Sequence, residues 1–143
     1  MLSPKTIGTI TEYECATYLM KLGLTVSTPI GDNAKYDLVV EINKKLYKLQ
    51  CKHGAYQNGG LMIECTTNIN TRTRLEKYTY QKDDVDYFCT FYNGMCYLIP
   101  FEKCKTVFKL RFESPGNNSK KGIHWADEYE APNVIKSIVD LSS

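Results

Sequence analysis

Two neighbouring apolar segments around residue 45 most constrain what this chain can fold into. Residues 36–42 and 46–52 are rich in Val, Ile, Leu and Tyr, and the polar turn of residues 43–45 separates them. This pattern predicts two antiparallel strands joined by a short turn. We therefore expect a β-sheet at the centre of the fold.

Polar side chains gather at one end of this predicted hairpin. Side chains alternate along a strand, so Gln50 and Lys52 point to one face, whereas Leu49 and Cys51 point to the opposite, apolar face. Asp37 begins the partner strand, and twelve residues separate it from Gln50. The hairpin therefore brings an acid, an amide and an ammonium group together.

A long helix is expected before the hairpin. Ser3 followed by proline is typical of an N-cap and a first helical position, and apolar residues then recur at helical spacing up to residue 22. Gly23 is a natural stop. The capping-box sequence of residues 11–14 leaves a later start open. In either case Glu12 lies within or beside this helix.

The rest of the chain alternates strand signals with turns. Asn93-Gly94 is the strongest short hairpin signal, and it joins residues 85–92 to residues 95–100. Residues 68–82 are expected to form a polar loop that leads into a helix, and residues 114–122 a long flexible loop. Further strands are expected at residues 24–27, 61–66 and 106–112, a helical turn at residues 101–105, and a closing helix at residues 133–141.

The composition is that of an ordinary globular protein, with 43% hydrophobic and 24% charged residues. Disordered, collagen-like and coiled-coil chains are therefore excluded. No apolar run approaches the roughly 20 residues of a membrane span, and the first residues lack a signal-peptide pattern. The net charge of +2 is too small to indicate a nucleic-acid partner by itself. We expect one α/β domain over residues 1–143, with no membrane partner.

The six cysteines are expected to be reduced. Their even number suggests disulfides, but the chain is long and has no secretory signal. No Cys-x-x-Cys motif occurs, and both histidines lie far from any pair of cysteines, which argues against a structural zinc site. We expect buried free thiols that behave as small hydrophobic side chains.

The residues at the hairpin end have the chemistry that phosphodiester hydrolysis requires. Carboxylate and amide oxygens suit Mg²⁺, which polarises a phosphoryl oxygen and lowers the pKa of a bound water. A nearby lysine orients that water or balances transition-state charge. Alone, Asp37 is a strand-end acid, and Gln50 and Lys52 are a solvated strand face. Their occurrence together with Glu12 favours a nuclease-type site.

His53 is either a general base or, as we favour, a hydrogen-bonded structural histidine.

The order and spacing of these residues resemble the PD-(D/E)xK nuclease superfamily, in which a helix Glu and a hairpin Asp precede an acid-x-Lys motif. The chain is most similar to the members associated with group I introns, and it also resembles archaeal-type Holliday junction resolvases. The resemblance rests on residues 11–12, 18–23, 29–37 and 46–52, with weaker extensions at residues 85–88, 97–100 and 126–129.

This resemblance implies a restriction-endonuclease-like α/β core, with a central mixed β-sheet flanked by helices, and a Mg²⁺-dependent DNA endonuclease. It implies that Asp37, Gln50 and Glu12 hold the metal ion directly or through water. The carbonyl of Cys51 is a further ligand, and Lys52 positions the attacking water. A homodimer or homotetramer is expected, because cutting two strands with one small active site requires at least two copies. The expected location is the cytoplasm, or wherever the host DNA resides.

Two residues depart from the family pattern. Tyr36 replaces a proline that is often absent, and Gln50 replaces the usual Asp or Glu. An amide oxygen still ligates Mg²⁺, but one negative charge is lost, so Glu12 must share the charge balance. A site-specific homing endonuclease is the expected function. A Holliday junction resolvase and a catalytically inactive DNA-binding domain are the alternatives.

Basic residues concentrate in the second half of the chain. Residues 101–121 contain six basic and two acidic side chains, a local net charge of +4. Such side chains track phosphates or read guanine edges, although an ordinary solvated face has the same composition. The residues expected to contact double-stranded or branched DNA are Lys35, Arg72, Arg74, Lys103, Lys105, Lys109, Arg111, Lys120 and Lys121.

Overall fold

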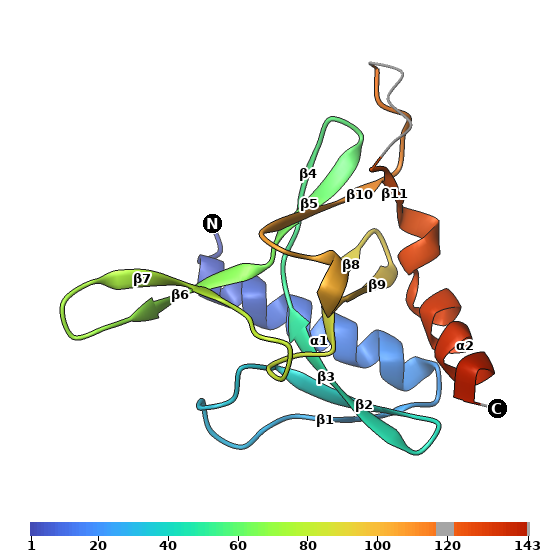
Figure 1. The fold of residues 1–143 in the computed structure, drawn as a ribbon, viewed down its shortest axis with the longest axis horizontal. Coiled ribbons are helices and arrows are strands. Elements are labelled where there is room, and N and C mark those ends of the chain that lie inside the picture. The colour runs from blue at the N-terminus through green and yellow to red at the C-terminus, as the bar shows by residue number, and fades with distance from the viewer. Residues whose placement is uncertain (117–121, 143) are drawn as a thin grey trace.

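The computed structural model of this chain describes residues 1–116 and 122–142 (Figure 1). Within them, the helical elements are α1 (Pro4–Lys21), η1 (Phe101–Lys103), η2 (Ala126–Tyr129) and α2 (Ala131–Ser142). The strands are β1 (Thr25–Ser27), β2 (Leu38–Ile42), β3 (Lys45–Cys51), β4 (Ala55–Gln57), β5 (Gly60–Glu64), β6 (Thr66–Asn70), β7 (Leu75–Thr79), β8 (Tyr87–Tyr92), β9 (Met95–Pro100), β10 (Val107–Arg111) and β11 (His124–Trp125). None of the described helices combines the length and the apolar character that crossing a membrane would need.

The central sheet is mixed, as predicted. It has five strands in the order β1-β2-β3-β8-β9. The β3–β8 pair is parallel and the other pairs are antiparallel. A second sheet has the order β11-β10-β5-β4, and β6 and β7 form a separate two-stranded arm.

The central sheet is buried on both faces. Alternate residues of β9 belong to different cores: Cys96 and Leu98 pack with α1 and α2, whereas Tyr97 and Ile99 pack with the second sheet. Burial on both faces explains why the sequence of β9 is continuously apolar rather than alternating. Helices α1 and α2 therefore pack in one core with the central sheet, and β5, β10 and η2 pack in the other.

Helix α1 begins where the proline signal predicts. The Oγ of Ser3 accepts a hydrogen bond from the backbone N–H of Thr6 at 3.2 Å, which caps the first turn. The later start at residue 11 was wrong, because Thr11 is buried inside the helix. Gly23 follows the helix with a φ of 88°, a conformation that favours glycine. The helix thus carries Glu12 on its third turn.

Both predicted hairpins are confirmed. The turn between β8 and β9 is Asn93-Gly94, with φ angles of 50° and 83°. Positive φ at both positions is what a tight hairpin turn of this type requires. The β2–β3 pair joins the strands that we expected around residue 45, with Leu38 opposite Leu49. Asp37 and Lys52 lie just outside the strands at the open end of that hairpin.

The expectation of a loop and a helix at residues 68–82 was wrong. Strands β6 and β7 form an antiparallel arm there, with Thr67 opposite Tyr78. The arm projects from the body of the molecule (Figure 1). Its side chains are polar on both faces, so the chain lacks the apolar periodicity by which a strand is usually recognised. The flexible loop expected at residues 114–122 lies largely outside the described residues.

Candidate active site

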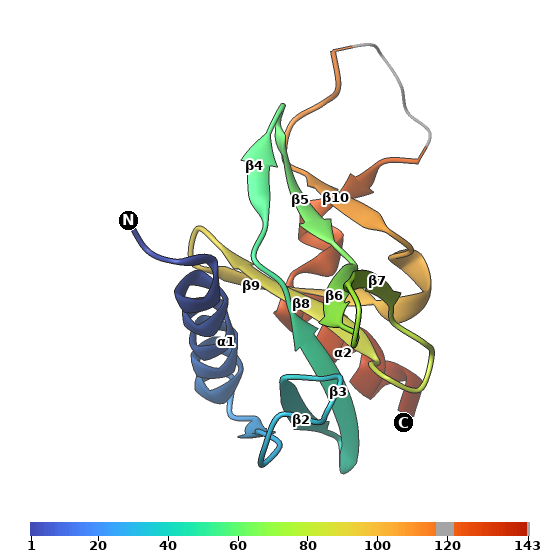
Figure 2. The same cartoon turned by 90° about the vertical axis from the view of Figure 1, so that its left-hand side faces the viewer.

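The predicted site lies at the C-terminal end of β3, where the β4–β5 hairpin and the β6–β7 arm leave the body of the molecule (Figures 1 and 2). Lys52, His53, Gln57, Glu64 and Thr66 help to line a cavity of about 370 Å³ at this point. Strand β3 supplies one side of the site, α1 the second, and the start of β6 the third. The site therefore opens to solvent beside the two projecting hairpins.

Asp37 is fixed by the backbone of the neighbouring strand. Its N–H donates to the carbonyl of Leu49 at 2.8 Å, and its Oδ2 accepts the N–H of Cys51 at 2.9 Å. Burial raises the pKa of this carboxyl, whereas the Cys51 hydrogen bond and the charge of Lys52 lower it. Two hydrogen bonds to the backbone of β3 thus fix the hairpin acid against Leu49 and Cys51.

Glu12 joins the site from α1. Burial raises its pKa from 4.5 to about 7, and the nearby charges of Asp37 and Cys51 add to the shift. A carboxyl whose pKa responds to a second carboxylate shares its surroundings with that group. The fold therefore pairs Glu12 with Asp37, although twenty-four residues separate them in the chain.

Lys52 joins the site directly after the end of β3. Its Nζ donates to the carbonyl of Thr66 at 3.0 Å and lies 5.0 Å from the ring centre of Tyr80. Burial lowers the pKa of this ammonium group, and the charges of Asp37 and Glu64 oppose that shift. The lysine is thus held half-buried between the hairpin acid and the start of the β6–β7 arm.

Gln50 and Cys51 complete the predicted set. Leu49 and Cys51 are buried beneath α1, whereas Gln50 is half-buried on the opposite face, where it pairs in register with Phe88. The alternation predicted for β3 is therefore confirmed. The structure brings Glu12, Asp37, Cys51 and Lys52 together, and Gln50 directly precedes Cys51 in β3.

Three contributions to the site were missed. The carbonyl of Thr66, the ring of Tyr80 and the charge of Glu64 all act on Lys52. None of these three residues is near Lys52 in the sequence, and no sequence motif predicts that they act on it. Burial also raises the pKa of Tyr80 to about 12, so its phenol stays protonated beside the lysine.

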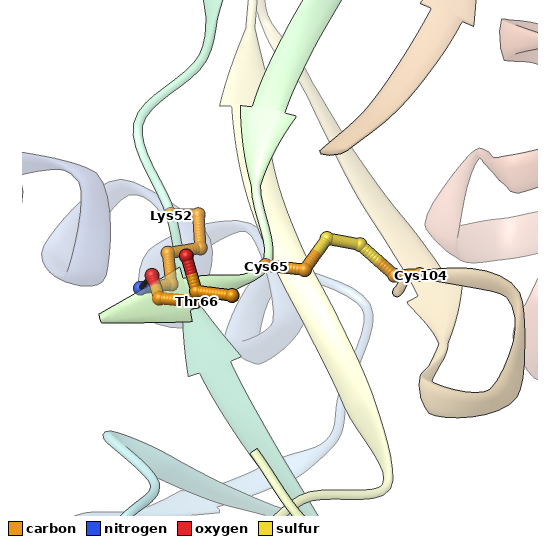
Figure 3. The surroundings of a disulfide bond; sticks show 4 residues. All are labelled: Lys52, Cys65, Thr66 and Cys104. Carbon is orange, nitrogen blue, oxygen red and sulfur yellow. Dashed lines mark hydrogen bonds between the residues drawn. A yellow bond between two sulfur atoms is a disulfide. The ribbon is translucent and has the colours of Figure 1, made fainter. Parts of the chain in front are cut away.

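A disulfide lies next to Thr66, whose carbonyl accepts the hydrogen bond from Lys52. Cys65 and Cys104 are linked, with Cα atoms 6.0 Å apart, and Thr66 follows Cys65 directly (Figure 3). The expectation that all cysteines are reduced was wrong for this pair. The two residues are 39 positions apart and meet only because β5 and β10 are neighbours in the second sheet. The other four cysteines are free and buried, as expected.

His53 has the structural environment that we favoured. Its Nδ1 lies 3.4 Å from the Oγ1 of Thr11, and that hydroxyl donates to the carbonyl of Ile7 at 3.1 Å. The imidazole therefore connects the end of β3 to α1, beside the cavity that Lys52 also lines.

The predicted DNA contacts fall in two regions. Arg72 and Arg74 are exposed at the turn of the β6–β7 arm, where Arg74 also pairs with Glu76 at 2.8 Å. Lys35 precedes Asp37 by two residues, and its Nζ lies 4.4 Å from the ring centre of Tyr78 in β7. These three basic residues border the same side of the molecule as the site.

The second region follows η1 and β10. Lys103, Lys109, Arg111 and His124 line a cavity of about 390 Å³. Arg111 is already engaged, since its Nη1 donates to the carbonyl of Asn58 at 2.9 Å. Lys105 is exposed next to η1. Lys120 and Lys121 lie outside the described residues.

Comparisons with known proteins identify the family and the fold of the chain. The family model described as PD-(D/E)XK endonuclease matches residues 2–132. No curated protein matches the sequence. The solved structure of a bacterial homing endonuclease, I-Ssp6803I, superimposes with a TM-score of 0.74 at 19% identity, covering 99% of each chain. The restriction-endonuclease-like fold is thereby confirmed.

Proposed function

The chain belongs to the PD-(D/E)XK endonuclease family, and from this membership we propose that it is a metal-dependent, site-specific DNA endonuclease of the homing type. Glu12, Asp37, Gln50 and Lys52 are its catalytic residues. One observation carries the proposal: the N–H of Cys51 donates to Asp37 Oδ2 at 2.9 Å. This bond fixes the hairpin acid against the segment that carries Gln50 and Lys52, so the site is formed before any substrate arrives.

The donor set fits a divalent metal ion, and we propose Mg²⁺. Asp37, Gln50 and Glu12 offer hard side-chain oxygens, and the backbone of Cys51 offers a carbonyl. Asp37 raises the pKa of Glu12, and the burial of both groups opposes their ionisation. A cation bound between the two carboxyl groups would offset this cost of ionisation. When bound, Mg²⁺ supplies positive charge for the scissile phosphate and acidifies the attacking water.

Lys52 has the position of a water-orienting residue. One of its three donors is used by the carbonyl of Thr66, which leaves the others for a water or a phosphate oxygen. Burial lowers its pKa, so the side chain exchanges a proton with the attacking water more readily than a solvated lysine does. Asp37 accepts the Cys51 N–H through Oδ2, so its Oδ1 is the oxygen that would bind the metal ion.

The basic residues support a DNA substrate. Arg72 lies at the tip of the β6–β7 arm, and Lys35 packs on Tyr78 of the same arm. A duplex laid against the site would meet the arm on one side and the basic cavity of Lys103 and Lys109 on another.

We propose that the working unit is a homodimer or homotetramer. One site cuts one strand, so a double-strand break by this chain needs a second copy. Helix α1 offers an apolar surface for it: Ile10, Tyr13 and Met20 are exposed. Light scattering coupled to gel filtration, with an Ile10→Asp variant, measures this directly. A monomeric wild-type protein that still makes double-strand breaks contradicts it.

Cleavage of two substrate types tests the proposed function. A labelled fixed four-way junction and a plasmid pool with mixed inserts are incubated with the protein in Mg²⁺ or in EDTA, with Asp37→Asn as the control for contaminating nucleases. Mg²⁺-dependent cutting at discrete duplex sites supports the homing function. Symmetric nicking of the junction alone identifies a junction resolvase. Binding of both substrates without cutting identifies an inactive DNA-binding protein.

A further inference from the structure

A group of buried cysteines lies on the helix side of the central sheet, away from the cavity beside Lys52. Cys51, Cys89 and Cys96 come from the neighbouring strands β3, β8 and β9, and Cys15 covers them from α1. Cys51 and Cys89 are direct register partners. All four side chains are 9% exposed or less. We call these residues the four-cysteine cluster.

The sulfur atoms of this cluster are in mutual contact. The Sγ atoms of Cys89 and Cys96 are 3.3 Å apart. Those of Cys15, Cys89 and Cys96 all lie within 4.8 Å of one another. Cys51 belongs to the same buried core and is the register partner of Cys89. Three ligand atoms from α1, β8 and β9 therefore converge, and Cys51 borders them from β3.

These spacings are those of a tetrahedral thiolate site. A Zn–S bond of about 2.3 Å places neighbouring sulfurs about 3.8 Å apart in a tetrahedron. The Cys89–Cys96 separation of 3.3 Å lies just below that value, and the three sulfurs of Cys15, Cys89 and Cys96 are within 4.8 Å of one another, so small side-chain rotations are enough for these three to hold one ion. Packing of cysteines as small hydrophobic groups needs no sulfur–sulfur convergence of this kind.

We propose that the four-cysteine cluster binds a structural Zn²⁺ ion. Each thiol gives its proton to solvent and an electron pair to the metal, and no oxidation state changes. Three thiolates from Cys15, Cys89 and Cys96 form the minimal ligand set, and Cys51 is the fourth. The absence of a Cys-x-x-Cys motif does not oppose this, because the parallel β3–β8 pairing brings the ligands together instead.

Such an ion would act on the fold rather than on the reaction. It would cross-link α1 to three strands of the central sheet at a closed, water-free position, which is typical of structural zinc. Cys15 is three residues from Glu12, and Cys51 is flanked by Gln50 and Lys52. The ion would therefore hold together the elements that carry the candidate active site. The inference does not depend on the proposed cleavage activity.

Metal content of the intact protein tests this inference. The chain is expressed with Zn²⁺ in the medium, purified with a reducing agent and dialysed against EDTA to remove ions held by exposed carboxylates. We expect about one zinc ion per chain to remain. Protein refolded with Co²⁺ should show the intense thiolate-to-cobalt charge-transfer absorption of a sulfur-ligated ion, which carboxylate ligands do not give.

Matched variants locate the ion. Cys89→Ala and Cys96→Ala should each weaken Co²⁺ binding by at least about tenfold, whereas the Cys65→Ala/Cys104→Ala double variant should retain it. Wild-type protein free of zinc, or a Co²⁺ form without charge-transfer absorption, overturns the inference. Retention of the metal by Cys89→Ala overturns it as well. If a cluster variant fails to fold, the two wild-type measurements decide alone.

Discussion

Replacing Glu12 by glutamine should stabilise the folded protein near pH 8 and leave its stability unchanged near pH 4. Glutamine has nearly the same shape as glutamate but cannot ionise. In the native protein, burial and the charge of Asp37 oppose ionisation of Glu12, which raises its pKa from 4.5 to about 7. Above that pH the wild-type protein folds with a disfavoured charge that the variant lacks.

The size of the effect follows from the pKa shift. A change from 4.5 to about 7 corresponds to at most about 3.5 kcal/mol, since one pKa unit is worth about 1.4 kcal/mol. Glu12 is only partly buried, so solvent screening reduces the figure to about 1–2 kcal/mol. For a chain of this length the melting temperature should rise by about 3–8 °C.

The pH dependence has a definite sign. Between the unfolded pKa of 4.5 and the folded pKa of about 7, the folded wild-type protein binds a proton at Glu12 that the unfolded chain has released. Wild-type stability therefore falls as the pH rises through this window, and the contribution levels off above it. The difference between Glu12→Gln and wild type should grow over the same window.

Urea unfolding of both proteins from about pH 4 to pH 8, in EDTA and without divalent cations, measures this difference. Glu14→Gln is the matched control, because Glu14 is exposed on the same helix. A stability difference that does not change with pH, or an equal gain from Glu14→Gln, refutes the claim that Glu12 and Asp37 share one site.

Four further results are expected. Lys52→Met should reduce DNA cleavage by at least about a hundredfold while Mg²⁺ binding, measured by calorimetry, persists; wild-type cleavage would contradict its assigned role. Gln50→Glu should bind Mg²⁺ more tightly by calorimetry, because it restores a negative charge at a ligand position, and weaker binding would argue that residue 50 is not a ligand. Arg72→Ala should weaken DNA binding uniformly across sequences and lower the salt slope by about one, which titration at several salt concentrations checks; loss of sequence preference would instead indicate base contact. Reduction of Cys65–Cys104, which are 39 residues apart, should lower stability by up to about 4 kcal/mol, and an unchanged unfolding midpoint with a reducing agent would show that the pair adds no stability.

Elements with local signals were predictable. The Ser3 cap and the Asn93-Gly94 turn are short-range features whose geometry depends on adjacent residues, and both appear as expected. The turn between β4 and β5 carries the same signal, since Asn58 and Gly59 have φ angles of 52° and 77°. The Asn-Gly pair therefore made the β4–β5 hairpin predictable from the sequence, but the hairpin was overlooked.

The β6–β7 arm was harder to predict from the sequence. Its pairing puts Thr66 opposite Thr79 and Asn68 opposite Lys77, so neither face is continuously apolar. Most of the arm projects from the body, and of its described residues only Thr66 and Tyr78 reach the core region, so the arm lacks the hydrophobic periodicity by which a strand is recognised. The frequent threonines were the one local signal that favoured strands over a helix.

The candidate site likewise has one part that the sequence predicts and another part that it does not. Asp37 and residues 50–52 belong to one hairpin, so alternation along its strands was enough to place them together. The partners of Lys52 could not be placed in this way. Thr66 and Tyr80 meet it only through the packing of the arm against β3, and the Cys65–Cys104 disulfide depends on the second sheet.

Cleavage by the Asp37→Asn variant tests the central claim most directly. Asparagine keeps a side-chain oxygen to accept the Cys51 N–H, so the hairpin is preserved while a metal-binding charge is removed. On a duplex that the wild-type protein cuts in Mg²⁺ and leaves intact in EDTA, Asp37→Asn should bind with similar affinity and cut at least about a hundredfold more slowly. Cutting by Asp37→Asn at the wild-type rate would contradict the account.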